Sequence, residues 1–236
     1  MTSSLRDLKV YTTYPHSCSY LEGQEAVTLF VDPRQLMDKP LYSKLSALGF
    51  RRSGSHIYRP HCSDCNACIP ARIPVSSFVP NRSQRRTLRR NEDLIVESTR
   101  DIRDSAAFDL YRRYIEQRHS DGDMYPPDRE QYESFLSNEW GCTDFYRFYD
   151  QGSLVAVAVV DELQDGLSAI YTFFDPTMTR RSLGSFAILW QVQRALEVGL
   201  DYLYLGYWIR GCQKMAYKSE YRPLELYINN RWTALT

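Results

Sequence analysis

Three consecutive strand-like segments in the second half of the chain limit the folds that it can adopt. Residues 145–150 and 153–162 are rich in aromatic and β-branched side chains, and Gln151-Gly152 between them is typical of a hairpin turn. A third strand is expected over residues 167–174, directly after Asp165-Gly166. The pattern predicts an antiparallel meander at the centre of this half.

Helical patterns surround the meander. Residues 103–119 carry apolar and aromatic side chains at helical spacing, namely Ala107, Leu110, Tyr111, Tyr114 and Ile115. A short helix is expected over 129–138, after a loop that contains Pro126-Pro127. Beyond the meander, we expect Ser182 to cap a helix that runs to about residue 198 and ends at Gly199.

The last segments complete the expected sheet. Residues 201–208 form a strand, a short helix follows near 211–218, and a last strand lies near 224–232. A meander followed by a helix and a neighbouring strand is the layout of the acetyltransferase-like (GNAT) fold, which is a statement about architecture and not about function. The second half is therefore expected to be a GNAT-like (acyltransferase) mixed-sheet domain.

The first half has a different character. A strand over 27–31 is broken by Asp32-Pro33, a helix is expected over 34–48, and short strands at 56–59 and 69–75 flank a cysteine cluster. Prolines keep these strands short, and a further strand is expected over 93–98. We predict an α+β protein with an N-terminal Cys-containing α/β domain over 1–100 and the GNAT-like domain over 101–236.

The composition excludes several classes of protein. The chain of 236 residues has 29 Lys and Arg against 29 Asp and Glu, and 43% of its residues are apolar, so disorder is excluded. No stretch approaches the roughly 18 apolar residues that a membrane span requires. The N-terminus lacks the apolar region of a secretory signal. We expect a cytoplasmic protein without a membrane partner.

Arginines concentrate in one part of the chain. Residues 51–100 hold ten Arg against four acidic residues, whereas residues 101–165 hold six Arg against fifteen. The two parts either neutralise each other or leave a basic face for a polyanion. Five arginines without an intervening acid, spaced as on a helix, favour nucleic acid, and they are Arg82, Arg85, Arg86, Arg89 and Arg90.

Three thiols lie within seven residues of the sequence. Cys62, Cys65 and Cys68 have Cys-x2-Cys-x2-Cys spacing, and Cys18 is a candidate for a fourth ligand. Four thiolates suit zinc or an iron–sulfur cluster, and the spacing does not decide between them. The alternative is a set of inert thiols. Cys142 and Cys212 stand alone, and we expect both to be buried.

The turn before the helix at 183 is a weak match to a coenzyme A loop. Acetyltransferases bind the pyrophosphate with backbone N–H groups of a Gly-containing turn at a helix start. Arg181-Ser182-Leu183-Gly184 fits the first half of that pattern, whereas Phe186 stands where a small residue is expected. The turn leaves open another phosphate-bearing donor, or simply a charged helix start.

Several ordered motifs resemble the arginyl-tRNA–protein transferase family over nearly the whole chain. The resemblance is carried by Cys18–Tyr20, Gly49–Gly54, Tyr58–Pro60, Cys65–Cys68, Tyr171–Pro176, Ser182–Gly184, Leu205–Ile209, Cys212–Lys218 and Tyr221–Pro223. The short length and the sequences Phe50-Arg-Arg-Ser-Gly and Ser83-Gln-Arg-Arg look like the bacterial branch, the aspartate/glutamate leucyltransferases.

This resemblance implies an aminoacyltransferase. It implies leucine as the donor, carried by leucyl-tRNA, and proteins with N-terminal Asp or Glu as acceptors, which the added residue marks for degradation by the N-degron (N-end rule) pathway. The ester is already activated, so no cofactor is needed for the chemistry, and catalysis depends on positioning and oxyanion stabilisation. The donor is expected between the strands 167–174 and 201–208.

Site residues follow as hypotheses from this interpretation. Tyr207, Tyr217 and Lys218 are candidates for contact with the oxyanion and the acceptor amine. Lys214 and Arg222 are candidates for the acceptor carboxylate, and Asp175 for an α-ammonium group. The arginines of 82–90 would bind the tRNA acceptor arm.

Two other functions remain open from the sequence. An acetyl-coenzyme A-dependent GNAT N-acetyltransferase would be stabilised against heat by coenzyme A and not by tRNA. A non-enzymatic zinc-binding RNA module would use the cysteine cluster and the arginine run, but it leaves the 201–223 segment without a purpose.

Overall fold

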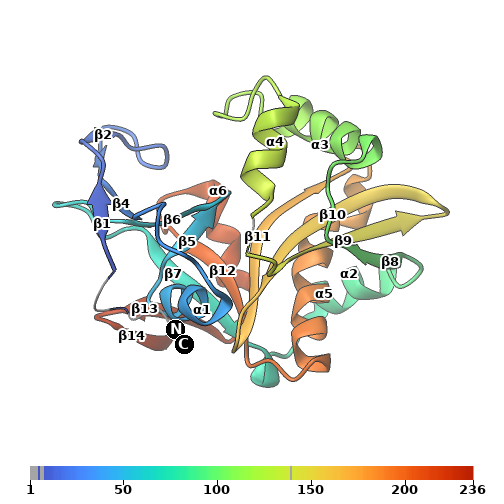
Figure 1. Cartoon of the computed structure of the whole chain (residues 1–236). Coiled ribbons are helices and arrows are strands. Elements are labelled where there is room, and N and C mark those ends of the chain that lie inside the picture. The colour runs from blue at the N-terminus through green and yellow to red at the C-terminus, as the bar shows by residue number, and fades with distance from the viewer. Residues whose placement is uncertain (1–4, 6–7, 139, 236) are drawn as a thin grey trace.

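The structure, a computed structural model, describes residue 5, residues 8–138 and residues 140–235. Its largest element is an eight-stranded mixed sheet with the order β14-β13-β7-β12-β11-β10-β9-β8 (Figure 1). The strands are β7 (Ile69–Pro74), β8 (Ile95–Thr99), β9 (Thr143–Asp150), β10 (Ser153–Glu162), β11 (Gly166–Phe174), β12 (Tyr202–Trp208), β13 (Leu224–Ile228) and β14 (Arg231–Leu235). The predicted α+β class with a mixed sheet is confirmed.

The predicted meander forms the middle of this sheet. Strands β9, β10 and β11 pair antiparallel in sequence order. The turn between β9 and β10 has positive φ at Gln151 (47°) and Gly152 (82°), which the two-residue hairpin turn requires. The side chains of β10 are buried from Val155 to Asp161, because helices cover both faces of the sheet.

Strands β11 and β12 form a fork. They run parallel and pair only at Gly166–Ser168 with Tyr202–Tyr204, although β11 continues to Phe174 and β12 to Trp208. The two strands therefore separate over their second halves. This is the gap that the sequence predicted between 167–174 and 201–208.

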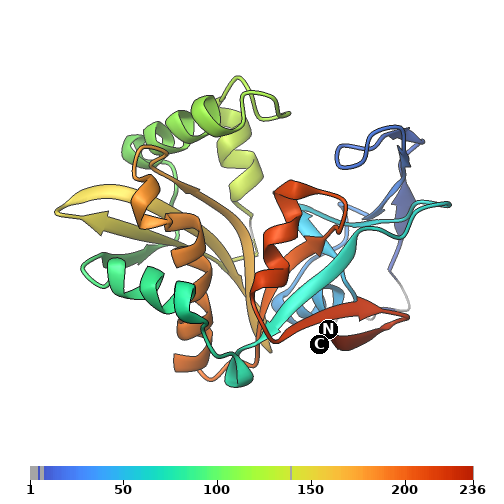
Figure 2. The same cartoon turned by 180° about the vertical axis from the view of Figure 1, so that it is seen from behind.

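Helices pack on both faces of the sheet (Figures 1 and 2). Helices α2 and α5 lie on one face, and α3 and α4 lie on the other. The helices are α1 (Lys39–Ala47), α2 (Arg82–Arg90), α3 (Ser105–Arg118), α4 (Arg129–Leu136), α5 (Leu183–Glu197) and α6 (Gln213–Ala216). A 3-10 turn, η4 (Tyr217–Glu220), follows α6 directly.

Three of the predicted elements differ from the structure. Helix α1 begins at Lys39 and not at residue 34, because the Asp38 side chain accepts the Leu41 N–H and caps it there. Ser182 precedes α5 in the left-handed region, and its side chain makes no capping bond. The single strand expected near 224–232 is a hairpin, with Asn229 and Asn230 at φ 52° and 60° in its turn.

A second, smaller sheet lies beside the first. It has the order β1-β4-β6-β5 and packs with α1 against β12 around a core that includes Tyr42, Ile57 and Tyr204. Its strands are β1 (Val10–Thr12), β4 (Thr28–Val31), β5 (Arg51–Ser53) and β6 (His56–Pro60), and a separate hairpin pairs β2 (His16–Ser17) with β3 (Glu25–Ala26).

The large sheet contains strands from both halves of the sequence. Strand β7 lies between β12 and β13, and β8 forms the edge next to β9, so residues below 100 complete the sheet built mainly by residues above it. The division of the chain at residue 100 stays a prediction. None of the helices in the described part of the chain is long and apolar enough to cross a membrane.

A buried ion pair joins the two sheets. Arg52 on β5 donates to both oxygens of Asp161 on β10, and both side chains are fully buried. The same carboxylate accepts the hydroxyls of Tyr42 (2.7 Å) and Thr143 (2.6 Å). A buried carboxylate with this many donors is compensated for its lost hydration.

Candidate active site

A buried lysine lies beside the fork between β11 and β12. Lys218, on η4, is only 4% exposed. Its Nζ donates to the main-chain oxygen of Tyr207 on β12 and lies 3.2 Å from the Met215 sulfur. No described carboxylate lies within ion-pair distance of this ammonium group.

The environment of Lys218 favours its neutral form. The pKa of Lys218 is lowered to about 7, first because burial removes the hydration of the charged form and second because the Arg51 guanidinium lies nearby. The thiol of Cys212 acts in the opposite direction. An amine with a pKa near 7 is half neutral at neutral pH, which suits it to accept and return a proton.

Arg51 occupies the fork itself. It extends from β5, is 8% exposed, and donates Nη1 to the Ser168 hydroxyl (2.9 Å) and Nη2 to the Ala169 oxygen (2.6 Å) on β11. On the other side it lies against Gly206 of β12, where a Cβ would meet the guanidinium at 3.4–3.6 Å. Those distances are ordinary contacts, and it is the backbone of Gly206, at φ +78°, that favours glycine there.

Two tyrosines predicted as catalytic lie next to Lys218. The Tyr207 hydroxyl donates to the main-chain oxygens of Gly49 (3.0 Å) and Tyr58 (3.4 Å), so it fixes β12 against the smaller sheet. Tyr217 is 43% exposed, its ring centroid lies 5.8 Å from the Lys218 nitrogen, and its hydroxyl bonds to no described residue. The structure thus brings together the three predicted catalytic residues, with different hydroxyl environments.

Two cations predicted to bind the acceptor carboxylate have protein partners. The exposed Lys214 ammonium pairs with Asp121 at 2.9 Å. Arg222 donates Nε to the Ser219 oxygen (3.0 Å) and Nη1 to the Leu235 oxygen near the end of β14. Among the described residues, neither side chain bonds to Arg51, Lys218 or Tyr207, so the structure does not gather them at the fork.

Asp175 lies where β11 ends. Its carboxylate accepts the main-chain N–H (2.9 Å) and hydroxyl (2.5 Å) of Thr177, and Arg113 lies 3.8 Å away. These bonds close a turn that leads the chain toward α5. The role predicted for Asp175, binding an α-ammonium, stays a prediction.

A pocket adjoins the start of α5. It has a volume of about 280 Å³ and is lined by Arg118, by Phe174 and Pro176 at the end of β11, by Met178 and Thr179, and by residues 182–185 at the start of α5. Phe186 does not line it. The Phe186 ring is buried against Phe148 with centroids 5.6 Å apart, so the crowding expected from this residue is absent.

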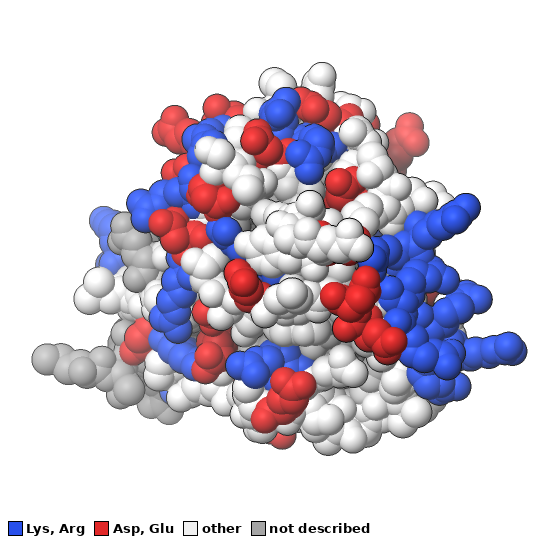
Figure 3. Space-filling model, turned by 90° about the vertical axis from the view of Figure 1, so that its right-hand side faces the viewer, with Lys and Arg blue, Asp and Glu red and all other residues white. Residues whose placement is uncertain are grey.

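The five arginines of α2 form one exposed basic edge. All five side chains are exposed, whereas Gln84 and Thr87 of the same helix are buried against the protein. Figure 3 shows Lys and Arg side chains gathered along this edge. None of the five is ion-paired to an acidic residue in the described part of the chain. Arg52 and Arg100, by contrast, pair with acids from the 101–165 part.

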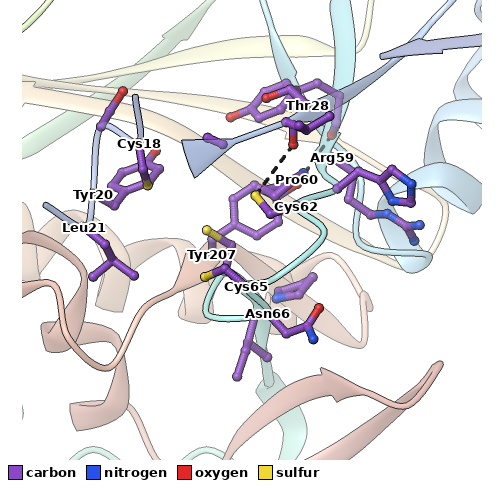
Figure 4. Close-up of a pocket in the computed structure, with 18 of the residues that line it drawn as sticks. Cys18, Tyr20, Leu21, Thr28, Arg59, Pro60, Cys62, Cys65, Asn66 and Tyr207 are labelled. Atoms are coloured by element: carbon purple, nitrogen blue, oxygen red, sulfur yellow. Dashed lines mark hydrogen bonds between the residues drawn. The ribbon is translucent and has the colours of Figure 1, made fainter. Parts of the chain in front are cut away.

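The four cysteines of the predicted metal site line one pocket of about 680 Å³ (Figure 4). Cys18 lies across it from Cys62 and Cys65, and Tyr207 forms part of its wall. Burial and the thiols of the other three raise the pKa of Cys68 to about 12. The donors match zinc or an iron–sulfur cluster in type and number. However, no three His, Cys, Asp or Glu among the described residues are gathered closely enough to hold a metal.

The remaining two cysteines behave as predicted. Cys142 and Cys212 are both buried, and all six cysteines are free thiols. A free, buried cysteine acts as a small apolar side chain.

Arg51 and Gly206 were not singled out from the sequence as site residues. Arg51 and Arg52 adjoin on a short strand, so their side chains point in opposite directions. Arg52 meets the buried Asp161, whereas Arg51 meets no described acid. Arg51 could have been noticed in the sequence as one of two adjacent arginines in a short strand with no acidic residue nearby in the chain.

Comparisons with known proteins agree over the whole chain. The family described as Arginine-tRNA-protein transferase, N terminus, matches residues 16–86, and its C-terminal counterpart matches residues 106–228. The aspartate/glutamate leucyltransferase of Pseudomonas entomophila is 58% identical over 99% of both chains. That of Teredinibacter turnerae is 58% identical over 98% of this chain and 95% of its own.

A solved structure supports the architecture. The crystal structure of FemX is similar with a TM-score of 0.50 at 11% identity, and the match covers 96% of this chain and 89% of that one. At this identity the likeness concerns the fold alone. The sequence matches are far stronger, and on them the chain belongs to the arginine-tRNA-protein transferase family.

Proposed function

We propose that this protein transfers leucine from leucyl-tRNA to the N-terminal amine of proteins that begin with Asp or Glu. The names of relatives that are 58% identical over nearly the full length support this donor and these acceptors. The structural observation that carries the proposal is the buried Lys218, whose pKa is lowered to about 7, beside the fork of β11 and β12. The added leucine would mark the acceptor for N-degron degradation in the cytoplasm.

In this mechanism, Lys218 moves the protons. Its neutral amine takes a proton from the acceptor's α-ammonium, and the free amine attacks the leucyl ester carbonyl. The new C–N bond forms as the bond to the ribose oxygen of the terminal adenosine breaks. Lys218 gives the proton it has taken to that oxygen, and the second proton lost by the amine goes to solvent. Holding the two substrates in register supplies much of the rate, because the ester is already activated.

The tyrosines would have separate roles. Tyr207 positions Lys218, because its main-chain oxygen accepts the Nζ bond while its hydroxyl holds the smaller sheet. The Tyr217 hydroxyl is free to donate to the oxygen that becomes negative in the transition state. Part of the Tyr217 residue, 43% by area, is exposed to solvent.

The basic edge of α2 would bind the tRNA. Arginines without an intramolecular acid are available to phosphates, and each phosphate neutralised releases counterions. The 280 Å³ pocket at the start of α5 would receive the nucleotide end of the donor, since its lining joins the end of β11 to the N-terminus of that helix.

The four cysteines of the 680 Å³ pocket would bind a zinc ion or an iron–sulfur cluster. We propose that Cys18, Cys62, Cys65 and Cys68 are its ligands, with closure of the pocket around the metal. The bound metal would cross-link the β2–β3 hairpin to the 61–68 loop. Metal analysis of purified protein, with Cys62→Ser as the variant, tests this: bound metal should fall with Cys62→Ser and stay with Cys142→Ser, and equal metal content in both variants would contradict it.

A transfer assay tests the main proposal. Purified protein would be mixed with radiolabelled leucyl-tRNA and peptides that begin with Asp, Glu or Ala, with arginyl-tRNA in a parallel reaction. We expect leucine on the Asp and Glu peptides and none on the Ala peptide. Lys218→Met should remove transfer, and Arg112→Gln, an exposed change on α3, should leave it intact. Folded protein that transfers from neither tRNA would overturn the proposal.

A further inference from the structure

The structure contains a buried arginine without an acidic partner. Arg51 is 8% exposed, and no described carboxylate lies within ion-pair distance of it. Two other buried arginines differ in this respect: Arg52 pairs with Asp161, and Arg72 pairs with Glu225 at 2.7 Å. A buried charge without a partner is costly, so its retention calls for a ligand of opposite charge.

The surroundings of Arg51 hold it in one orientation. The Ser168 hydroxyl and the Ala169 oxygen each accept one of its N–H groups from the β11 side, and Gly206 lies against it on the β12 side. A guanidinium group has five N–H donors. Three of them therefore have no described partner, in the gap where the two strands separate.

A second positive charge lies close to Arg51. The Lys218 ammonium shares this region, and the two cations disfavour each other. A carboxylate placed between them would be attracted to both. The planar guanidinium group of Arg can donate two parallel hydrogen bonds to a carboxylate, which no other side chain matches as well.

We propose that Arg51 binds the side-chain carboxylate of the acceptor's N-terminal Asp or Glu. This inference rests on the proposed function. It places the acceptor carboxylate at the Arg51 end of the fork and the α-amine of the same residue at Lys218, which receives its proton. Arg51 is then the residue that selects acidic acceptors, in place of Lys214 and Arg222, which have their own partners.

The test compares acceptors that differ only in charge. Leucine transfer would be measured with peptides that begin with Asp, Asn, Glu or Gln, for the wild type and Arg51→Gln. We expect kcat/KM for the Asp and Glu peptides to fall about 30-fold or more, since a buried charge pair loses one partner. Transfer to Asn and Gln peptides should change little, so the preference for Asp over Asn collapses. The Kd for leucyl-tRNA should be unchanged.

Arg72→Gln is the matched control. Arg72 is as buried as Arg51 and lies in the large sheet, but it already pairs with Glu225. Its loss should lower stability and leave the preference for Asp over Asn as in the wild type. A preference that survives in folded Arg51→Gln would overturn the inference.

Two milder variants decide the question if Arg51→Gln does not fold. Ser168→Ala removes one hydrogen bond that orients the guanidinium. Arg51→Lys keeps the positive charge but loses the planar guanidinium group, which can bind both oxygens of a carboxylate. Both should reduce the preference for Asp over Asn several-fold, and an unchanged preference in both would overturn the inference. A wild type that transfers leucine to no peptide would instead contradict the proposed function.

Discussion

At the scale of single residues, the candidate site depends on buried cations. Lys218 and Arg51 are both more than nine-tenths buried, and the described part of the chain supplies neither with an acid. Groups of this kind destabilise a fold unless their charge is neutralised or paired. A strongly shifted pKa at a cleft is a feature of functional sites. Lys218 therefore makes a direct prediction about pH.

Wild-type stability should rise with pH because of Lys218. The pKa of this amine falls from 10.5 to about 7 on folding, so between these values the unfolded chain binds a proton that the folded chain lacks. Raising the pH in that window favours the folded state, by about 2 kcal/mol between pH 7 and pH 9. Urea unfolding at both pH values, for the wild type and Lys218→Met, measures this contribution.

The comparison isolates one group. From pH 7 to pH 9, the free energy of unfolding of the wild type should increase by about 2 kcal/mol more than that of Lys218→Met. Lys214→Met is the control, because its exposed ammonium pairs with Asp121 at the surface. If the wild type and Lys218→Met respond equally to pH, Lys218 does not titrate near 7. The transfer rate of the wild type should rise through pH 7 and level off above it.

At the scale of elements, the sequence predicted single helices and strands better than it predicted which strands lie side by side in the sheet. Strand β10 (153–162) follows from its run of β-branched and apolar side chains, and the buried face of α3 follows from helical periodicity. The central place of β7 did not, because Pro70 and Pro74 favour an edge. The structure accommodates them because β13 pairs only with Ala71 and Arg72, between the two prolines.

The site residues also differ in how far the sequence predicts them, because some are close in the chain and others meet only through tertiary packing. Tyr207, Tyr217 and Lys218 lie within twelve residues of one another in the sequence, and the structure places them side by side. Arg51 reaches them through pairing of β5 and β6 and packing of the smaller sheet, which no local pattern encodes. Lys214 and Arg222 lie in the same segment, yet their side chains leave it for other partners.

Helix α2 should control the salt dependence of tRNA binding. Arg82, Arg86 and Arg89 are exposed and make no hydrogen bond to a described residue. Changing all three to Gln should weaken leucyl-tRNA binding and reduce the slope of log K against log salt by about 0.7–0.9 for each phosphate that is no longer neutralised. Filter binding between 50 and 200 mM salt, roughly, measures the slope.

Arginines on other helices provide the control for the salt dependence of α2. Gln replacements at the exposed Arg112 on α3 and the partly exposed Arg129 on α4, which are both ion-paired, should leave the slope unchanged. At saturating tRNA, the α2 variant should keep the wild-type rate of transfer, because these arginines lie outside the fork. An unchanged slope would show that α2 does not contact the tRNA backbone.

At the scale of the whole molecule, the smaller sheet is part of the candidate active site. It supplies Arg51 to the fork, and the Arg52–Asp161 pair holds the same strand against β10. The large sheet in turn includes β7 and β8 from the first hundred residues. Stability and the geometry of the fork should therefore depend on one another.

Asp161→Asn tests this dependence. The change leaves Arg52 buried without its carboxylate, which should cost about 3–5 kcal/mol of unfolding free energy. It should also lower leucine transfer, because β5 carries both Arg52 and Arg51. Asp109→Asn, which breaks the exposed pair with Arg112 on α3, should alter neither. Urea unfolding of the wild type should show one transition, since the two halves of the sequence share a sheet. Full transfer by a destabilised Asp161→Asn would mean that the fork holds its geometry without this pair.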